Sequence, residues 1–282
     1  MRVAIIGLGL IGGSMGMALS RLDADIEVVG FARKPRVASR ALALGAVKRT
    51  ELSAASAVSG ADLVIVATPA MAVKGVLSEI SGGLSKGAIV TDVASTKSAV
   101  MDWAEEVLPV SVNFIGGHPM AGKEASGIEA ADGDLFQGCT YCLVPGRNAT
   151  KKAVASLEAL VRRIGAEPLF LDAAEHDRLV AGISHLPLLI SVALVSVTAG
   201  SPLWPAMARL AATGYRDVSR LASGDPLMGR DICLTNKEPI LHWLDDYMEE
   251  LKRVRSLVNR GGGELEQAFV RAREAREKWL RM

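Results

Sequence analysis

A glycine-rich segment near the start of the chain constrains the fold more than any other feature of the sequence. The segment reads GLGLIGGSMG and directly follows the short apolar run RVAII. Gly7, Gly9 and Gly12 have the spacing of the turn that joins the first strand and helix of a βαβ unit, where they allow a tight bend, a close pyrophosphate and close helix packing. The segment therefore predicts a dinucleotide site, with Leu10 and Ile11 at the helix N-terminus that faces the phosphates.

The residues after the second expected strand indicate which dinucleotide binds. Sites for NAD usually carry Asp or Glu about 20 residues after the last glycine, where the carboxylate binds the ribose 2′-hydroxyl. Ala32 stands there in this chain, and Arg33 and two further cations follow it. We therefore expect NADP, whose 2′-phosphate pairs with cations, and NAD stays open as the alternative. Thr68 and Pro69 end another expected strand and should border the cofactor.

The alternation of strands and helices defines the expected architecture. Short β-branched runs separated by helical segments predict a doubly wound, mostly parallel sheet of the Rossmann-like α/β class. The expected strands are residues 2–7, 26–32, 62–68, 87–93, 112–117, 141–145 and 167–173. The later pattern is helical, with helices expected at residues 174–199, 202–222, 238–260 and 263–282. We predict a dinucleotide-binding domain at 1–172 and an all-helical domain at 173–282.

Composition excludes several other classes of protein. The chain has 32 Lys and Arg against 31 Asp and Glu, so no overall field favours nucleic acid or an anionic membrane. Three cysteines suit a reducing compartment, so we expect a cytoplasmic protein. The CTYC spacing falls in an expected strand and predicts no metal site. The apolar stretch at 186–200 is shorter than a membrane span and is expected to be a helix buried on all sides.

Two segments should meet at the reacting edge of the sheet. TDVASTKS and FIGGHPMAGKEASG each follow an expected strand, and ligands of doubly wound sheets lie beyond the carboxyl ends of the strands. Ser95 and His118 could therefore lie together beside the nicotinamide. Histidine has a pKa near neutrality, so His118 can take a proton from an alcohol while hydride leaves the same carbon. We expect His118 in a glycine-rich loop whose small residues leave room for a substrate.

At this point the sequence resembles the prephenate and arogenate dehydrogenases of tyrosine biosynthesis. The resemblance covers almost the whole chain through GLGLIGGS, VATP, TDVASTK, GGHPMAG, EHD, ISHLP and GYRDVSRLA, in that order. It implies a Rossmann-like domain, a helical domain that forms a homodimer, and oxidative decarboxylation of prephenate to 4-hydroxyphenylpyruvate with hydride transfer to NAD(P). Loss of the ring carboxylate as CO2 makes the ring aromatic.

The resemblance also implies roles for particular residues. His118 matches the catalytic histidine that accepts the proton of the ring hydroxyl, and Ser95 matches the serine that hydrogen-bonds this histidine and the hydroxyl. Arg216 in GYRDVSR matches the arginine that holds a substrate carboxylate, for which a planar guanidinium is suited. His185 in SHLP matches a histidine that lines the substrate pocket. His176 in EHD is expected to be structural.

Other functions remain open. Some relatives that use prephenate carry SHLPH, whereas Leu188 stands at the last position here, so arogenate is an alternative substrate. A dehydrogenase of small β-hydroxy acids also joins a Rossmann-like domain to helices, although GGHPMAG with Ser95 argues against it. A dinucleotide-sensing protein without catalysis is the third possibility. Sequence leaves tyrosine inhibition open as well.

Overall fold

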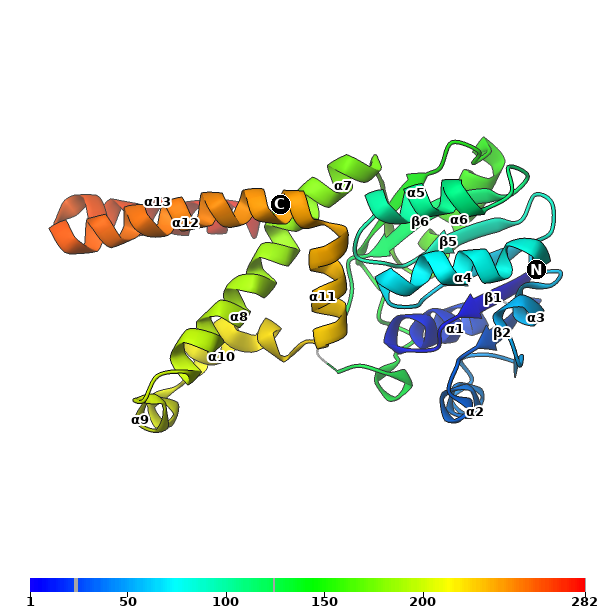
Figure 1. The fold of residues 1–282 in the computed structure, drawn as a ribbon, viewed down its shortest axis with the longest axis horizontal. Coiled ribbons are helices and arrows are strands. Elements are labelled where there is room, and N and C mark those ends of the chain that lie inside the picture. Colours follow the sequence, from blue (N-terminus) through cyan, green and yellow to red (C-terminus); the bar gives the residue numbers. More distant parts are fainter. Residues whose placement is uncertain (23–24, 124, 282) are drawn as a thin grey trace. The chain divides into compact units, whose positions relative to one another are not determined.

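The computed structural model describes residues 1–22, 25–123 and 125–281, which form two compact units. The first unit comprises residues 1–237 and contains the whole sheet together with every helix up to α11 (Figure 1). The second comprises residues 238–282, the greater part of α12 (Lys237–Arg260) together with α13 (Gly263–Trp279).

The first unit is built on one eight-stranded sheet. Its strand order is β3-β2-β1-β4-β5-β6-β7-β8, and the only antiparallel pair is β6 with β7. The strands are β1 (Arg2–Ile6), β2 (Glu27–Phe31), β3 (Arg49–Thr50), β4 (Leu63–Val66), β5 (Ile89–Asp92), β6 (Asn113–Pro119), β7 (Thr140–Pro145) and β8 (Glu167–Phe170). The Rossmann-like fold class and all seven expected strands are confirmed. The two-residue β3 was not expected, since it is too short to carry a pattern.

Strand order locates the crevice where a dinucleotide can bind. β1 pairs with β2 on one side and with β4 on the other, so the chain reverses its direction across the sheet between β1 and β4. In doubly wound sheets such a switch point leaves a crevice at the carboxyl ends of the two strands. The predicted cofactor residues follow β1, β2 and β4 and therefore meet at this edge.

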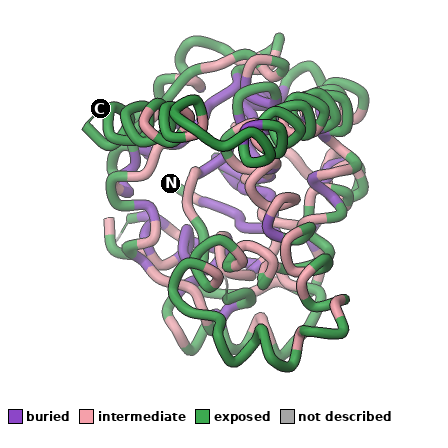
Figure 2. The backbone as a smooth tube through the Cα atoms, turned by 90° about the vertical axis from the view of Figure 1, so that its left-hand side faces the viewer, coloured by how far each residue is buried: buried purple, intermediate pink, exposed green. Residues whose placement is uncertain are grey.

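Helices cover both faces of the sheet. They are α1 (Leu10–Leu22), α2 (Pro35–Ala43), α3 (Ala54–Val58), α4 (Val73–Ile80), α5 (Ser98–Val107) and α6 (Lys151–Arg163). One apolar cluster joins α1 and α6 to the sheet, and a second joins α3, α4 and α5 to its other face. Figure 2 shows the buried backbone gathered in the interior. Strands buried on both faces explain why the expected strands are continuous apolar runs.

The helical part of the first unit follows β8. Its elements are α7 (Ala173–Val180), the π-helix η4 (Ala181–His185), α8 (Leu186–Ala199), α9 (Trp204–Leu210), α10 (Thr213–Ser219), the 3₁₀ turn η5 (Arg220–Ser223) and α11 (Pro226–Thr235). The helix expected at 202–222 is broken at Ala211 and Ala212, which have extended backbone. α11 was not expected, although Asp225 caps its first turn and Pro226 starts it.

The apolar stretch at 186–200 corrects one prediction. α7, η4 and α8 form a continuous helix of 27 residues, long and apolar enough by composition to cross a membrane. Only Ser191 of α8 is buried, so a helix buried on all sides was the wrong expectation for the single chain. Three polar residues of this helix, His176, Asp177 and His185, are nevertheless buried and hydrogen-bonded within the first unit. That bonding makes the helix part of the folded unit.

The second unit is a pair of helices joined by a glycine turn. Gly261 and Gly262 have φ of +66° and +84°, a left-handed conformation that favours glycine. The basic sequence RAREAREKWLRM begins within α13, and its described side chains are exposed, as in a solvated helix face.

Candidate active site

The glycine turn after β1 has the geometry of a phosphate-binding loop. Gly7 has φ +103°, and a Cβ there would lie 2.3 Å from the carbonyl oxygen of Ala67. A Cβ on Gly12 would lie 1.9 Å from the Gly7 carbonyl oxygen, so only glycine lets α1 start this close to the strand. A Cβ on Gly9 would meet nothing within 4 Å. The turn is therefore crowded at Gly7 and Gly12 and open at Gly9, the place at which the pyrophosphate is expected.

A cavity of about 580 Å³ opens beside this turn, between the ends of β1, β2 and β4. Gly7, Gly9, Arg33, Thr68 and Pro69 all line it, so the structure brings most of the predicted cofactor residues to one place. Its lining is mainly apolar. The Oγ1 atom of Thr68 is buried and has no hydrogen-bond partner among the described residues, so it is available to a ligand. An apolar cavity with a few placed polar groups suits a nucleotide, so these residues fit the predicted cofactor.

A buried ion pair fixes the neighbouring strand ends. Lys97 and Asp92 are both completely buried, and the Lys97 ammonium group donates to the Asp92 carboxylate and to the Gly117 carbonyl oxygen, 2.7 Å away. Asp92 also accepts from the backbone N–H groups of Ala94 (2.8 Å) and Gly117 (3.1 Å). Burial lowers the pKa of Lys97, an effect that Asp92 opposes. The pair joins the end of β5 to β6 immediately before His118.

The glycines before His118 have a different role from the predicted one. His118 is not in a loop: it is the penultimate residue of β6 and is buried opposite Cys142 of β7. A Cβ on Gly117 would lie 2.5 Å from the Asp92 carbonyl oxygen. One on Gly116 would lie 2.8 Å from a methionine sulfur and 3.2 Å from Cδ of Lys97. Both glycines therefore make room for the buried ion pair and its surroundings.

Three side chains form a hydrogen-bonded chain that ends at His118. His118 Nδ1 lies 2.9 Å from His176 Nε2, with the ring centroids 5.1 Å apart and the planes at 67°. His176 Nδ1 lies 2.9 Å from the Asp177 carboxylate. His176 and Asp177 come from the first helix after the sheet, so a segment 58 residues further along the chain orients His118.

Asp177 is held from three directions. Its carboxylate accepts from the backbone N–H groups of Lys97 (2.7 Å) and Ser98 (2.8 Å), and so caps the first turn of α5. Burial raises the pKa of Asp177, but the hydrogen bonds from His176, Ser98 and Lys97 outweigh burial and lower it. An ionised carboxylate accepts hydrogen bonds and donates none. His176 Nδ1 therefore carries the proton in the bond to Asp177.

The bond to Asp177 leaves the Nε2 atom of His176 to face His118. In the tautomer in which this Nε2 carries no proton, it accepts, and His118 donates to it through Nδ1. His118 then has its lone pair at Nε2. Burial, followed by the nearby His176 and Lys97, lowers the pKa of His118 well below its usual value. At neutral pH the ring is therefore an uncharged base.

A π-helical turn brings a third histidine to the same region. His176 and His185 are nine residues apart, about two and a half turns of a regular α-helix, and would face opposite sides. Pro187 has no N–H to donate to the carbonyl four residues earlier, and η4 forms there, with the Leu186 N–H bonded to the Ala181 carbonyl. His185 is thereby buried near His118, whose pKa it helps to lower.

His185 is in the opposite tautomer to His118. Asn236, next to the end of α11, donates through Nδ2 to the Asp177 carbonyl oxygen (2.8 Å) and to His185 Nδ1 (3.1 Å). His185 therefore carries its proton on Nε2, which is buried without a hydrogen-bond partner among the described residues. Burial lowers the pKa of His185 to about 4. The ring is a neutral hydrogen-bond donor at physiological pH.

The other two predicted site residues are placed differently. Ser95 is half-buried in the loop after β5, and its backbone carbonyl raises the pKa of His185. No hydrogen bond joins Ser95 to His118 within the described chain. Arg216 is exposed on α10. Among the described residues, no hydrogen bond joins its side chain to His118, His176 or His185. The sequence analysis missed Asp92, Lys97 and Asn236 and took His176 for a structural residue.

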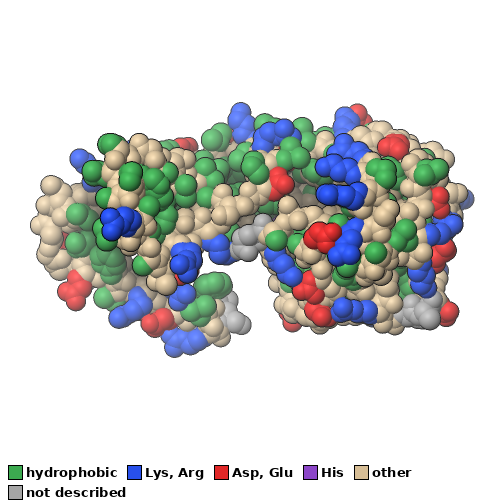
Figure 3. Space-filling view, turned by 90° about the horizontal axis from the view of Figure 1, so that it is seen from below, with side chains coloured by type: hydrophobic (Ala, Val, Ile, Leu, Met, Phe, Trp, Pro, Cys, Tyr) green, Lys and Arg blue, Asp and Glu red, His purple; other side chains and the backbone are tan. Residues whose placement is uncertain are grey.

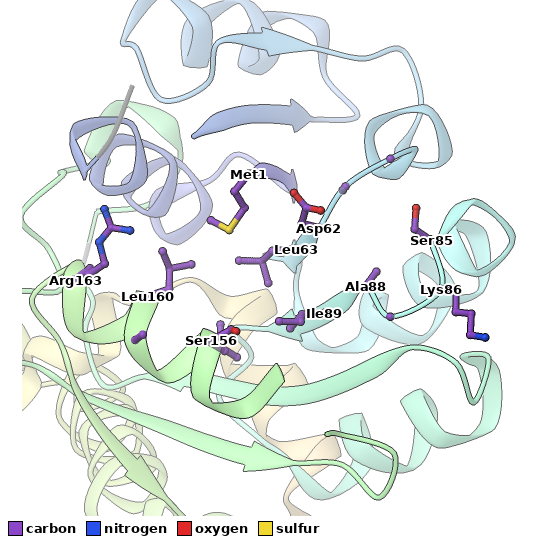
Figure 4. Close-up of a pocket in the computed structure, with 15 residues that line it drawn as sticks. Met1, Asp62, Leu63, Ser85, Lys86, Ala88, Ile89, Ser156, Leu160 and Arg163 are labelled. Atoms are coloured by element: carbon purple, nitrogen blue, oxygen red, sulfur yellow. The ribbon is translucent and has the colours of Figure 1, made fainter. Parts of the chain in front are cut away.

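A second cavity, of about 470 Å³, lies at the other edge of the sheet, where β4 and β5 begin (Figure 4). Met1, Leu63 and Ile89 line it with the exposed cations Lys86 and Arg163. None of its lining residues, all of them described, is a histidine or a cysteine, and it lies away from the switch point. Within the described chain no group of three His, Cys, Asp or Glu side chains could hold a metal ion.

Comparisons with known proteins agree with this geometry. Residues 15–169 match the nucleotide-binding domain of prephenate dehydrogenase, and residues 172–272 match its dimerization domain. Prephenate dehydrogenase from Bacillus subtilis is 37% identical over 98% of this chain and 75% of its own length. The structure of prephenate dehydrogenase from A. aeolicus, in complex with hydroxyphenyl propionate and NAD+, has a TM-score of 0.91, with 28% identity over 99% of this chain and 98% of that one.

The arogenate dehydrogenase structure from Synechocystis has a TM-score of 0.83 and is 31% identical over 99% of this chain and 100% of that one. Both domain matches, the relative from Bacillus subtilis and the site geometry lead to one assignment. The chain belongs to the prephenate dehydrogenase family of nicotinamide-dependent oxidoreductases.

Proposed function

We propose that this protein catalyses oxidative decarboxylation of prephenate to 4-hydroxyphenylpyruvate, a step of L-tyrosine biosynthesis. The observation that carries the proposal is the buried His118, which is bonded to His176 at Nδ1 and lies at the end of β6 in the same sheet as the glycine turn. A base beside a nicotinamide site can deprotonate an alcohol as its carbon loses hydride. Family membership identifies which alcohol: the ring hydroxyl of a cyclohexadienyl acid.

The proposed roles follow from the chemistry of each side chain. His118 accepts the hydroxyl proton at Nε2, and the retained Nδ1–H keeps the ring bonded to His176. Ser95 hydrogen-bonds the same hydroxyl and, with substrate present, His118. His185 donates through Nε2 within the substrate pocket, and Arg216 holds a substrate carboxylate. When bound, the nicotinamide would accept the hydride that leaves C4 of the substrate ring. Loss of the ring carboxylate as CO2 completes aromatisation of the substrate.

The substrate side chain distinguishes prephenate from arogenate, a keto acid from an amino acid. Leu188 lies in α8 close to α11, since a Cβ on Gly229 would be 3.9 Å from its Cδ2 atom. An apolar residue there offers no hydrogen bond to either side chain. Arogenate dehydrogenase is therefore the alternative, and it shares every proposed step at the ring.

NADP is the proposed cofactor, with NAD as the alternative. Arg33 lines the cavity at the end of β2 and is exposed, and no carboxylate occupies the position after that strand. A 2′-phosphate would pair there with the guanidinium. If this holds, Arg33→Ala will weaken NADP binding about tenfold or more and leave NAD binding nearly unchanged, because one charge-assisted hydrogen bond contributes roughly 1.5–3 kcal/mol. Equal losses for both cofactors in calorimetric titrations would contradict the assignment.

A cytoplasmic homodimer is the proposed form of the protein. Hydrophobic side chains are exposed on the helical part of the first unit, as Figure 3 shows for one face of it. They include Val197, which is 75% exposed, and Leu210, which is 83% exposed, with Leu203, Met207 and Val218. Exposed apolar surface of this kind marks a protein interface. We propose functional domains at 1–172 and 173–282, with the second forming the dimer.

The test is an initial-rate assay of NAD and NADP reduction, each with prephenate and with arogenate. One substrate and cofactor pair with the highest kcat/KM would define the activity. Simple β-hydroxy acids form the control set, and turnover of these alone would favour the alternative dehydrogenase. Tight NADP binding with no oxidation of any cyclohexadienyl acid would refute catalysis and favour a dinucleotide-sensing protein.

A further inference from the structure

His176 and Asp177 have no assigned part in the chemistry, yet His176 forms the only hydrogen bond to the His118 ring among the described residues, and Asp177 bonds His176 in turn. His176 is fully buried, and Asp177 is 2% exposed. Burying two polar side chains is costly unless they are hydrogen-bonded, and these are bonded to each other and to His118. Their arrangement has one consequence for the base: it decides which nitrogen of His118 carries the proton.

We propose that His176 is a positioning residue, which holds His118 in the Nδ1–H tautomer and keeps its Nε2 lone pair free for the substrate. Asp177 fixes His176 in turn, because its carboxylate can only accept. The proposal deepens the proposed function, on which its catalytic meaning rests. In the reaction the substrate proton binds to Nε2, the Nδ1–H bond to His176 is kept, and the resulting positive charge lies at the end of a chain that terminates in a carboxylate.

A purely structural role is the competing explanation. Asp177 caps α5 through Lys97 and Ser98 and bonds Asn236 through its carbonyl oxygen, so it helps to hold α7 against the sheet edge. That role requires neither a ring at position 176 nor a particular tautomer of His118. The two explanations therefore differ at His176, where the test is made.

Two substitutions divide the functions of the His176 ring. Glutamine can place its amide oxygen where Nε2 lies and accept from His118, whereas asparagine can place its amide N–H where Nδ1 lies and donate to Asp177. His176→Gln therefore keeps the bond that sets the tautomer, and His176→Asn removes it. His242→Asn is the matched control, since His242 is an exposed residue of α12 that lies 3.7 Å from Asp246.

The first readout needs neither substrate nor cofactor. The chain has four histidines, so ¹⁵N-histidine labelling with long-range ¹H–¹⁵N spectra can assign each ring tautomer. We expect His118 protonated at Nδ1 in the wild-type protein and in His176→Gln, and a loss of that preference in His176→Asn. Protonation of wild-type His118 at Nε2 would overturn the proposal, as would an unchanged tautomer in a folded His176→Asn protein.

The second readout is the kinetic effect of the same substitutions. We expect His176→Asn to lower kcat by roughly 10- to 100-fold, within the contribution of general base catalysis, with KM little changed. His176→Gln should recover most of the loss, and equal losses in both variants would favour the structural explanation. If the tautomers are as expected but no cyclohexadienyl acid is oxidised, the proposed function fails and the positioning of His118 stands. An active enzyme with the other tautomer refutes the positioning alone.

Discussion

The buried His185 should make folding stability depend on pH in a way that one substitution can isolate. Burial lowers its pKa in the folded protein from 6.5 to about 4. Between these values the unfolded chain binds a proton that the folded chain does not, so stability is greatest above pH 6.5 and is lost as pH falls toward 4. One pKa unit corresponds to about 1.4 kcal/mol, so His185 destabilises the folded state by about 3 kcal/mol below both pKa values.

Most of that change should occur between pH 7 and pH 5, where linkage gives about 2 kcal/mol. The assay is urea unfolding of the wild-type protein and His185→Asn at both pH values and one protein concentration. Asparagine does not titrate, and its amide oxygen can still accept from Asn236. We expect wild-type stability to fall about 2 kcal/mol further than that of the variant. His242→Asn, which removes an exposed histidine, should behave like wild type. Equal losses in wild type and His185→Asn would refute the reasoning.

Other predictions address the base, the substrate and the cofactor turn. His118→Asn should lower kcat by about 10²- to 10⁴-fold with little change in KM, and full turnover by this variant in initial-rate assays would refute the assignment. Arg216→Ala should chiefly raise KM. Arg220→Ala is measured in parallel, because Arg220 lies one helical turn further on. A larger rise in KM for Arg220→Ala would assign the substrate carboxylate to Arg220 instead. Gly9→Ala should leave Tm nearly unchanged and weaken cofactor binding. Gly12→Ala should lower Tm, because its Cβ would lie 1.9 Å from a carbonyl oxygen. A larger loss of Tm in Gly9→Ala than in Gly12→Ala would contradict the role of the turn.

Much of the fold follows from local sequence, and the exceptions have physical reasons. The expected strands are apolar because both faces of the sheet are covered, so each could be located from a run of a few residues. β3 has two residues and owes its place to pairing with β2 rather than to its own pattern. α11 had a usable signal, since Asp225 and Pro226 form a standard helix start. Residues 186–200 were expected to form a helix buried on all sides because their composition is apolar. Composition alone does not distinguish a helix in the core of the chain from one whose apolar side chains are exposed on its surface.

Less of the candidate site could be predicted from the sequence, because the residues that hydrogen-bond one another there are far apart in the chain. The glycine turn combines all its features within a few residues, so its geometry could be predicted. His118 could be predicted as the candidate base from its motif, but its hydrogen-bond partner His176 is 58 residues further along. Lys97 resembles an ordinary surface lysine until the fold buries it between two strand ends. The π turn that positions His185 depends on Pro187, a cue that acts only once the helix has formed.

The two histidines of the candidate site, His118 and His185, show what the helical segment contributes to it. Burial alone would make His118 and His185 alike, since it lowers the pKa of both. They differ in what each Nδ1 meets: that of His118 donates to His176, and that of His185 accepts from Asn236. The His118 ring thus offers a lone pair, which a hydroxyl that gives up its proton would require. The His185 ring offers an N–H, which would suit a neighbouring polar group that accepts a hydrogen bond. The partners that set this difference come from α7 and the end of α11, whereas the sheet supplies the glycine turn and the proposed base. The same Rossmann-like sheet can therefore serve other reactions when different helices follow it.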